Sequence, residues 1–538
     1  MLLERLQPSA IFKSHFNTKA ATIICFLLAL TNKCLLAWIY TDLEGDKALY
    51  LLFAKSMMNG QHPLEEMGLI NGIQNIFFNG GIHSPLYSVI AIPFLWLTGS
   101  FTATSFIIDI LSWIIFFSGL YKCAYVILGE KWIANIFILC TGFFLYPHEL
   151  ESTPKDTMAI GLLFWSCFLF MRFVSDPPKF RNSFLMVLAL LGFCLLKFLY
   201  APLMLLFLIL LFFFAVKKRK KFYLKHAFFI SASCLLFCFA YYGYIVYLKQ
   251  LSQAKMMQDI QLQQVFIKGF YPQNMRQAFP FISAAILNTN FWCVQIADIL
   301  NQSFADVMRF FKYLDLLLVI FILVYIRKKI SGKINNKPFW IAAPLISAAI
   351  LFMLFFMSLR YKAVLFDGYS SYWTYVKEPR SYLFIIVFLQ VSLLYFIFKK
   401  KGKVAFKNFL LFLFFIECFH GAYFTVKQVS MSGAIRHAFS NTKPVKKITN
   451  ILSFAHRDQT TIALSTPDAP LRRYALLNNI PVLSYRNQPC NMAEQSETKR
   501  VLIAVYEKDT ARLDTCIDKY IVRRDTISPF ILLLYEQK

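Results

Sequence analysis

A carboxylate at the start of a short helix is the first residue of this chain whose setting points to chemistry. Residues 41–60 read TDLEGDKALYLLFAKSMMNG and follow a long apolar run. Asp46, Tyr50 and Ala54 are spaced i, i+4 and i+8, so they share one face of a helix that has Asp46 in its first turn. A carboxylate there can accept a proton from a nucleophile. Helix capping is the alternative, because negative charge is favourable in a first turn.

Other charged residues lie at the ends of later apolar runs. Glu151, Lys155 and Asp156 come just before one run, Lys197 ends another, and Arg380 comes just before a third. Carboxylates at such positions can orient an acceptor or bind a metal ion, and cations can stabilise a phosphate. For Lys197 and Arg380, snorkelling to the membrane interface is the alternative.

The elements that must position these residues are membrane-spanning helices. Hydrophobic residues make up 58% of the 538 and charged residues only 16%, with a mean hydropathy of +0.54, which is too apolar for a soluble globular chain. The net charge of +27 comes from short Lys/Arg clusters between apolar runs. That pattern is typical of cytoplasmic loops and argues against a nucleic-acid partner, which would need one basic face.

Placing the basic clusters in the cytoplasm gives the topology. We expect about eleven spans of roughly 20 residues, beginning with the uninterrupted apolar run 20–40. They lie near 20–40, 102–121, 132–147, 157–174, 182–197, 200–216, 226–248, 308–326, 339–358, 381–398 and 408–426. The apolar run 86–97 is short and contains Pro93, so we expect an interfacial or re-entrant helix there. Counting it as a span would move the basic cluster 217–221 to the outer side.

With this topology the N-terminus is cytoplasmic and the acidic residues gather outside. The expected external loops of the membrane domain, residues 1–430, are 41–101, 148–156, 249–307 and 359–380. Asp46 lies in the first of these loops and Asp156 in the second. The sequence therefore predicts an all-α polytopic membrane protein with its chemistry on the outer face.

Residues 431–538 are predicted to form a small, soluble, extracytoplasmic α/β domain. Strand-like runs at 461–465, 481–485, 500–506 and 530–535 alternate with helical stretches at 470–479 and 510–520. Cys490 and Cys516 can form a disulfide if the compartment is oxidising.

Four segments carry a family resemblance. They are the segment around Asp46, H-S-P-L-Y at 83–87, K-D-T-M-A at 155–159, and L-G-F-C-L-L-K at 191–197 followed by Pro202. In this order, and on the same side of the membrane, they resemble motifs of GT-C glycosyltransferases, most closely the protein O-mannosyltransferase and aminoarabinose transferase group. The resemblance covers roughly residues 20–220. One departure is Lys47, where the family often has Glu.

The resemblance implies a GT-C-like enzyme of the cytoplasmic (inner) membrane. It would move a hexosyl or pentosyl group from a polyprenyl-phosphate donor to an acceptor on the outer face, which is a glycolipid, a protein or a polymer. Asp46 would be the general base, and Asp156 would help to orient the acceptor or a metal ion. A divalent cation is a candidate cofactor, with these two Asp as its candidate ligands. The implied substrate-binding residues are Tyr50, His83, Tyr87, Glu151, Lys155, Lys197 and Arg380.

Two other functions stay open. A transporter or flippase would show paired repeats and charges near the middle of the bilayer, whereas most acidic residues here lie in the external loops and the C-terminal domain. A non-catalytic subunit of envelope polysaccharide assembly would keep the fold without the chemistry, and Lys47, which cannot serve as a carboxylate, leaves room for that alternative.

Overall fold

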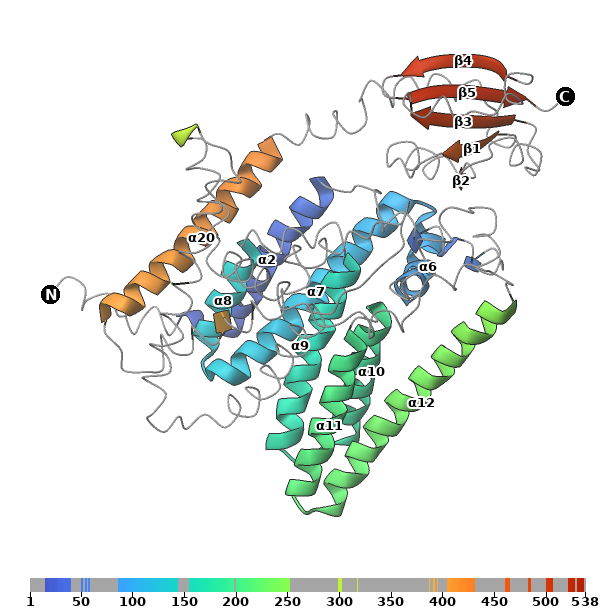
Figure 1. Cartoon of the computed structure of the whole chain (residues 1–538). Coiled ribbons are helices and arrows are strands. Elements are labelled where there is room, and N and C mark those ends of the chain that lie inside the picture. The colour runs from blue at the N-terminus through green and yellow to red at the C-terminus, as the bar shows by residue number, and fades with distance from the viewer. Residues whose placement is uncertain are drawn as a thin grey trace. The chain divides into compact units, whose positions relative to one another are not determined.

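The chain divides into two compact units in the computed structural model (Figure 1). One comprises Met1–Ala37, Asp109–Leu248 and Gln261–Lys427, and the other comprises Trp38–Ile108, Lys249–Ile260 and Gln428–Lys538. The residues that the structure describes are 15–39, 50–51, 54–55, 57–58, 86–143, 154–197, 200–251, 299–301, 317, 387, 390–391, 394, 404–430, 460–464, 482–484, 500–506, 521–527 and 530–536. The expected span 339–358 lies outside them, and only single positions of 308–326 and 381–398 are included.

Long apolar helices occupy the described part of the membrane domain. They are α2 (Lys19–Ile39), α7 (Phe101–Leu128), α8 (Lys131–Phe143), α9 (Pro154–Ser175), α10 (Phe180–Leu196), α11 (Ala201–Lys217), α12 (Lys221–Leu251) and α20 (Val404–Ser430). Each overlaps one of the expected spans. Among the described residues, four helical segments are long and apolar enough to cross a bilayer, namely Lys19–Ile39, Phe101–Leu128, Asp156–Ser175 and Lys221–Tyr241. The chain is therefore a multi-pass membrane protein, while the total of eleven spans stays a prediction.

The short apolar run before α7 also forms a helix, α6 (Leu86–Thr98). Gly99 ends it with a φ of +60°, a conformation that glycine adopts without strain, and its N–H donates to the Leu95 carbonyl. The Ser100 hydroxyl then accepts from the Ala103 N–H and caps α7. At 13 residues, α6 is about 20 Å long, too short for a bilayer core of roughly 30 Å. Its interfacial position stays a prediction.

Glycines bring α7 and α9 into close contact. A Cβ added to Gly119 of α7 would lie 2.6 Å from the Gly161 carbonyl oxygen of α9. Beside this contact the Trp165 indole N–H donates to the Ser118 hydroxyl at 3.1 Å. Small residues that let two backbones approach, with a polar bond between the helices, are typical of packing within membranes.

Helix α8 packs against both α2 and α20. The Asn32 side-chain amide of α2 donates to the Gly142 carbonyl at 2.7 Å, next to the contact between Gly142 and Ala29. From the other side, Gly421 of α20 lies directly against the backbone of Phe143. Helices from the two ends of the membrane domain therefore meet at α8.

Helices α9, α10, α11 and α12 form a group of neighbours in the same unit (Figure 1). The Phe170 ring of α9 contacts Phe207 and Phe214 of α11. The Ser183 hydroxyl of α10 is hydrogen-bonded to His226 of α12 at 2.9 Å. Because α9 and α10 are joined by a short turn, they run in opposite directions.

The C-terminal region contains a five-stranded sheet of order β2-β1-β3-β5-β4. Its strands are β1 (Thr460–Leu464), β2 (Val482–Ser484), β3 (Arg500–Tyr506), β4 (Ile521–Ile527) and β5 (Phe530–Glu536). The β1–β2 and β1–β3 pairs are parallel, whereas β3–β5 and β4–β5 are antiparallel. Four strands lie close to their predicted positions. The predicted helices 470–479 and 510–520, and Cys490 and Cys516, lie outside the described residues.

Strand β4 was missed by the sequence prediction. Its sequence IVRRDTI places three charged residues in succession and breaks the apolar pattern expected of a strand. Among the described strands, β4 is an edge strand that pairs with β5 and has a register shift between Ile521 and Arg523. Charges and irregular pairing are common on edge strands, because they discourage pairing with a further chain.

Candidate functional site

Two predicted site residues lie where α9 begins and α10 ends. Pro154 opens α9, a position that suits its fixed φ and missing N–H, and Asp156 follows in the first turn. At the other junction α10 ends at Leu196, and Lys197 is extended (φ −146°, ψ 98°), with its N–H bonded to the Phe193 carbonyl.

Asp156 and Lys197 form a buried ion pair. The Lys197 Nζ lies 2.9 Å from Asp156 Oδ1, and the two residues are only 5% and 4% exposed. A charge buried this deeply is costly unless it is compensated, so each residue stabilises the charged form of the other. The pair links the first turn of α9 to the residue that follows α10 and fixes the direction in which the carboxylate points.

An aromatic ring completes the surroundings of the ammonium group. The Lys197 Nζ lies 5.5 Å from the centre of the Tyr200 ring, and Tyr200 is fully buried. The backbone N–H of Tyr200 also donates to the Lys197 carbonyl at 2.9 Å. The short link between α10 and α11 therefore holds the lysine between a carboxylate and an aromatic face.

In the other unit, two predicted substrate-binding tyrosines meet. The rings of Tyr50 and Tyr87 lie 5.0 Å apart, and the residues are 2% and 0% exposed. Ala54, on the same predicted helix face as Tyr50, is also fully buried. The predicted helix face is therefore buried, and through the Tyr50–Tyr87 contact it packs against α6.

The remaining predicted site residues lie outside the described residues. These are Asp46, His83, Glu151 and Arg380, together with the side chain of Lys155. Within the described part of the chain, no three His, Cys, Asp or Glu side chains come together as a metal centre. Of the two candidate metal ligands only Asp156 is described, and its carboxylate is paired with an ammonium group.

A buried lysine was missed by the sequence prediction. The apolar run 20–40 is interrupted by one cation, Lys33, which is 1% exposed in α2. Its Nζ lies 5.4 Å from the centre of the Trp113 ring of α7. Asp109, 2% exposed, lies one turn from Trp113 on the same face of α7. The sequence did indicate that Lys33 is unusual, because a charged side chain inside a membrane span is costly and is therefore usually functional or paired.

Comparison with solved structures shows what the fold resembles. The chain is similar to ArnT from Cupriavidus metallidurans bound to undecaprenyl phosphate, with a TM-score of 0.52 and 10% sequence identity over 96% of this chain and 98% of that one. The same protein in the apo state matches with a TM-score of 0.41 and 11% identity over 94% and 97% of the two chains. No protein-family model and no curated protein matches the sequence. The undecaprenyl-phosphate-bound structure confirms the predicted GT-C resemblance at the level of fold.

Proposed function

We propose that this protein is a glycosyltransferase of the cytoplasmic membrane that transfers a sugar from a polyprenyl-phosphate donor to an acceptor on the outer face. The observation that carries the proposal is the buried Asp156–Lys197 pair, which joins two residues of the GT-C-like motifs within a chain whose fold resembles that of ArnT. Fold alone does not define activity, so the proposal depends on the chemistry of these residues. The ArnT structure contains undecaprenyl phosphate, which supports a lipid of this class as the donor's carrier here.

The proposed reaction is a displacement at the anomeric carbon of the donor sugar. A nucleophilic atom of the acceptor forms a bond to that carbon, and the bond from the carbon to the phosphate oxygen breaks. The electron pair leaves with the polyprenyl phosphate. Asp46 takes the proton from the acceptor nucleophile, and a nearby cation stabilises the leaving phosphate.

The ion pair supports separate roles for the two cations predicted at the phosphate. Lys197 is already engaged by Asp156, and this favours Lys197 as a positioning residue that orients the carboxylate toward the acceptor. Arg380 then becomes the preferred partner of the leaving phosphate, with His83, Glu151 and Lys155 as further substrate contacts. The burial of Tyr50 and Tyr87 favours a supporting role, in which their rings hold the segment that follows Asp46.

The outward position of this pair is supported by α9 itself. Asp156 lies in the first turn of α9 and Arg172 in its last turn, about 24 Å apart along the helix axis. The basic residues of the α9–α10 turn follow Arg172, and such clusters remain in the cytoplasm. Asp156 and Lys197 then belong to the outer end of the helix, which suits a lipid-linked donor.

A divalent cation stays a candidate cofactor, because Asp46, one of its two candidate ligands, lies outside the described residues. Asp46 and Asp156 would hold it, and it would stabilise negative charge on the leaving phosphate.

Lipid binding tests the donor side of the proposal. Purified protein in detergent is titrated with undecaprenyl phosphate and with undecaprenol, and the complexes are counted by native mass spectrometry. We expect a clear preference for the phosphorylated lipid and a loss of that preference in Arg380→Gln. Equal binding of both lipids by the wild-type protein would contradict the proposed donor.

A further inference from the structure

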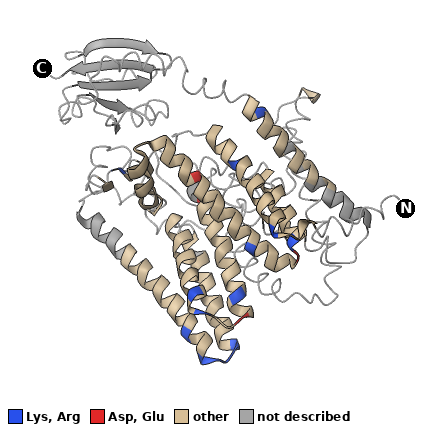
Figure 2. Ribbon diagram, turned by 180° about the vertical axis from the view of Figure 1, so that it is seen from behind, with Lys and Arg blue, Asp and Glu red and all other residues tan. Residues whose placement is uncertain are grey.

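Positive charge is concentrated at the end of α9–α12 opposite the Asp156–Lys197 pair. Arg172, Lys179 and Arg181 lie at the α9–α10 turn, and residues 217–225 carry a further six cations. All nine of these cations are exposed, and one acidic residue, Asp176, lies in the two segments. Figure 2 shows Lys and Arg gathered at this end of the helix group.

The two basic segments are held together by contacts between their helices. The buried Ser183 hydroxyl of α10 is hydrogen-bonded to Nδ1 of His226 in α12 at 2.9 Å. The Phe173 ring of α9 contacts the Tyr223 ring of α12 with 5.6 Å between centres. The cations of the two turns therefore act on one region of space.

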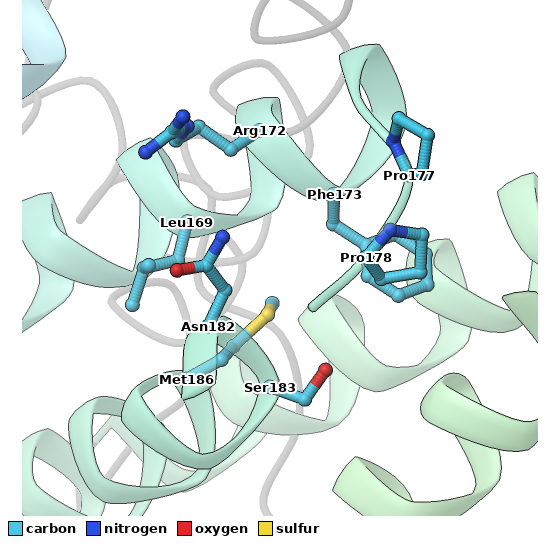
Figure 3. Close-up of a pocket in the computed structure, with 8 residues that line it drawn as sticks. All are labelled: Leu169, Arg172, Phe173, Pro177, Pro178, Asn182, Ser183 and Met186. Carbon is cyan, nitrogen blue, oxygen red and sulfur yellow. The ribbon is translucent and has the colours of Figure 1, made fainter. Parts of the chain in front are cut away.

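A recess opens beside these cations (Figure 3). It is small, with about 10 Å³ of space, which is room for about one water molecule, and it is lined by Leu169, Arg172, Phe173, Pro177, Pro178, Asn182, Ser183 and Met186. Arg172 and Asn182 bring polar side chains to its α9 and α10 sides. Arg172 is paired with Asp176 at 3.6 Å, but both side chains are about half exposed, so the pair is weak. A guanidinium has five N–H donors and can bind a phosphate as well.

Exposed aromatic side chains lie next to the same cations. Phe180 is 64% exposed at the start of α10, and Phe222 and Phe228 of α12 are 48% and 67% exposed. In a multi-pass protein such rings face lipid, so the neighbouring cations lie at the level of the headgroups. A soluble anion or a nucleic acid would not need this apolar border, whereas a phospholipid would.

We propose that the exposed cations around this recess bind the headgroup of an anionic membrane phospholipid at the surface of the two turns. The phosphate lies at Arg172 and Asn182, with the cations of both turns around it, and the acyl chains run along the exposed aromatic side chains. Bound in this way, the lipid connects the α9–α10 turn to the α11–α12 turn. The site does not depend on the proposed glycosyl transfer, because it lies at the opposite end of α9.

Lipid titration of the delipidated protein tests this site. Phosphatidylglycerol and phosphatidylcholine with the same acyl chains are added in detergent, and binding is followed by native mass spectrometry. We expect phosphatidylglycerol to bind at least about tenfold more tightly, since each cation near an anionic lipid contributes roughly a fivefold change in affinity. In Arg172→Gln/Arg181→Gln the two lipids should bind equally. The matched control Lys122→Gln/Lys131→Gln removes the same charge from the last part of α7 and the start of α8 and should keep the preference.

Three results would overturn the site. They are equal binding of the two lipids by the wild-type protein, an equal loss of preference in the control variant, and competition by inorganic phosphate at the lipid's concentration. If Arg172→Gln/Arg181→Gln does not fold, Lys179→Gln/Lys220→Gln replaces it, because both of its positions are exposed. Retention of the full preference in that variant would likewise contradict the proposal.

Discussion

Asp156, in the first turn of α9, and Lys197, the residue just after α10, meet at 2.9 Å, and almost no solvent reaches either one. The pair sets the relative position of the two helix ends through a charge interaction in a poorly hydrated place. Removing either residue takes away the opposite charge that lies 2.9 Å from the other one in this buried place.

The first prediction follows from that dependence. Asp156→Asn and Lys197→Met each keep the side-chain size and should each lower the free energy of unfolding by about 3–5 kcal/mol. The double variant should lose less than the sum of the two, since the interaction between the two side chains can be lost only once. Denaturant unfolding in detergent measures all three values. Additive losses would show that the two residues do not interact.

Helix packing gives a second prediction. A Cβ at Gly161 would lie 2.7 Å from the Phe116 backbone, whereas a Cβ at Gly192 would meet only the end of the Leu162 side chain. Gly161→Ala should therefore lower the free energy of unfolding by about 1–3 kcal/mol. Gly192→Ala is the matched control and should cost distinctly less, because a Leu side chain can rotate away. Similar losses in thermal unfolding would contradict the close contact of α7 with α9.

Sequence patterns predicted the helices better than the contacts between them. The positions of α2, α7 and α9–α12 could be predicted from long apolar runs, because a helix that spans the bilayer must be mostly apolar along its length. Strand β4 was not predicted, because the charged residues common on an edge strand interrupt the apolar pattern by which strands are identified. Asp156 and Lys197 were each identified as site candidates, but their pairing depends on which helix ends meet in space, and spacing along the chain carries no such information.

Lys33, the cation within the apolar run 20–40, gives a third prediction. Its Nζ lies over the Trp113 ring within the described helix pair α2–α7. A double-mutant cycle of Lys33→Met and Trp113→Leu should yield a coupling energy of about 0.5–2 kcal/mol in thermal unfolding. A coupling of zero would mean that the ring and the ammonium group are neighbours without interaction.

The fourth prediction concerns the sidedness of the candidate site. A membrane-impermeant maleimide should label Glu151→Cys in intact cells but label Arg219→Cys only after the membrane is opened, because basic turns remain in the cytoplasm. Both variants are made in a background without the other accessible cysteines, and labelling in opened cells is the control for reactivity. The reverse pattern would place Asp156 next to the cytoplasm and remove the proposed outer-face site.

The fifth prediction concerns the chemistry. Asp46 is the proposed general base, so Asp46→Asn should lower the rate of sugar transfer by about 100-fold or more while the protein still folds and binds undecaprenyl phosphate. A neighbouring change that leaves the carboxylate in place, Lys47→Gln, is the matched control and should keep most of the activity.

Transfer itself tests the central claim most directly. Purified protein is incubated with envelope lipids that contain polyprenyl-phosphate sugars and with an envelope acceptor fraction, and the release of free polyprenyl phosphate is followed by mass spectrometry. The proposed function predicts time-dependent release by the wild-type protein and almost none by Asp46→Asn. Equal release by both proteins, or none by the wild-type protein with any acceptor fraction, would contradict it.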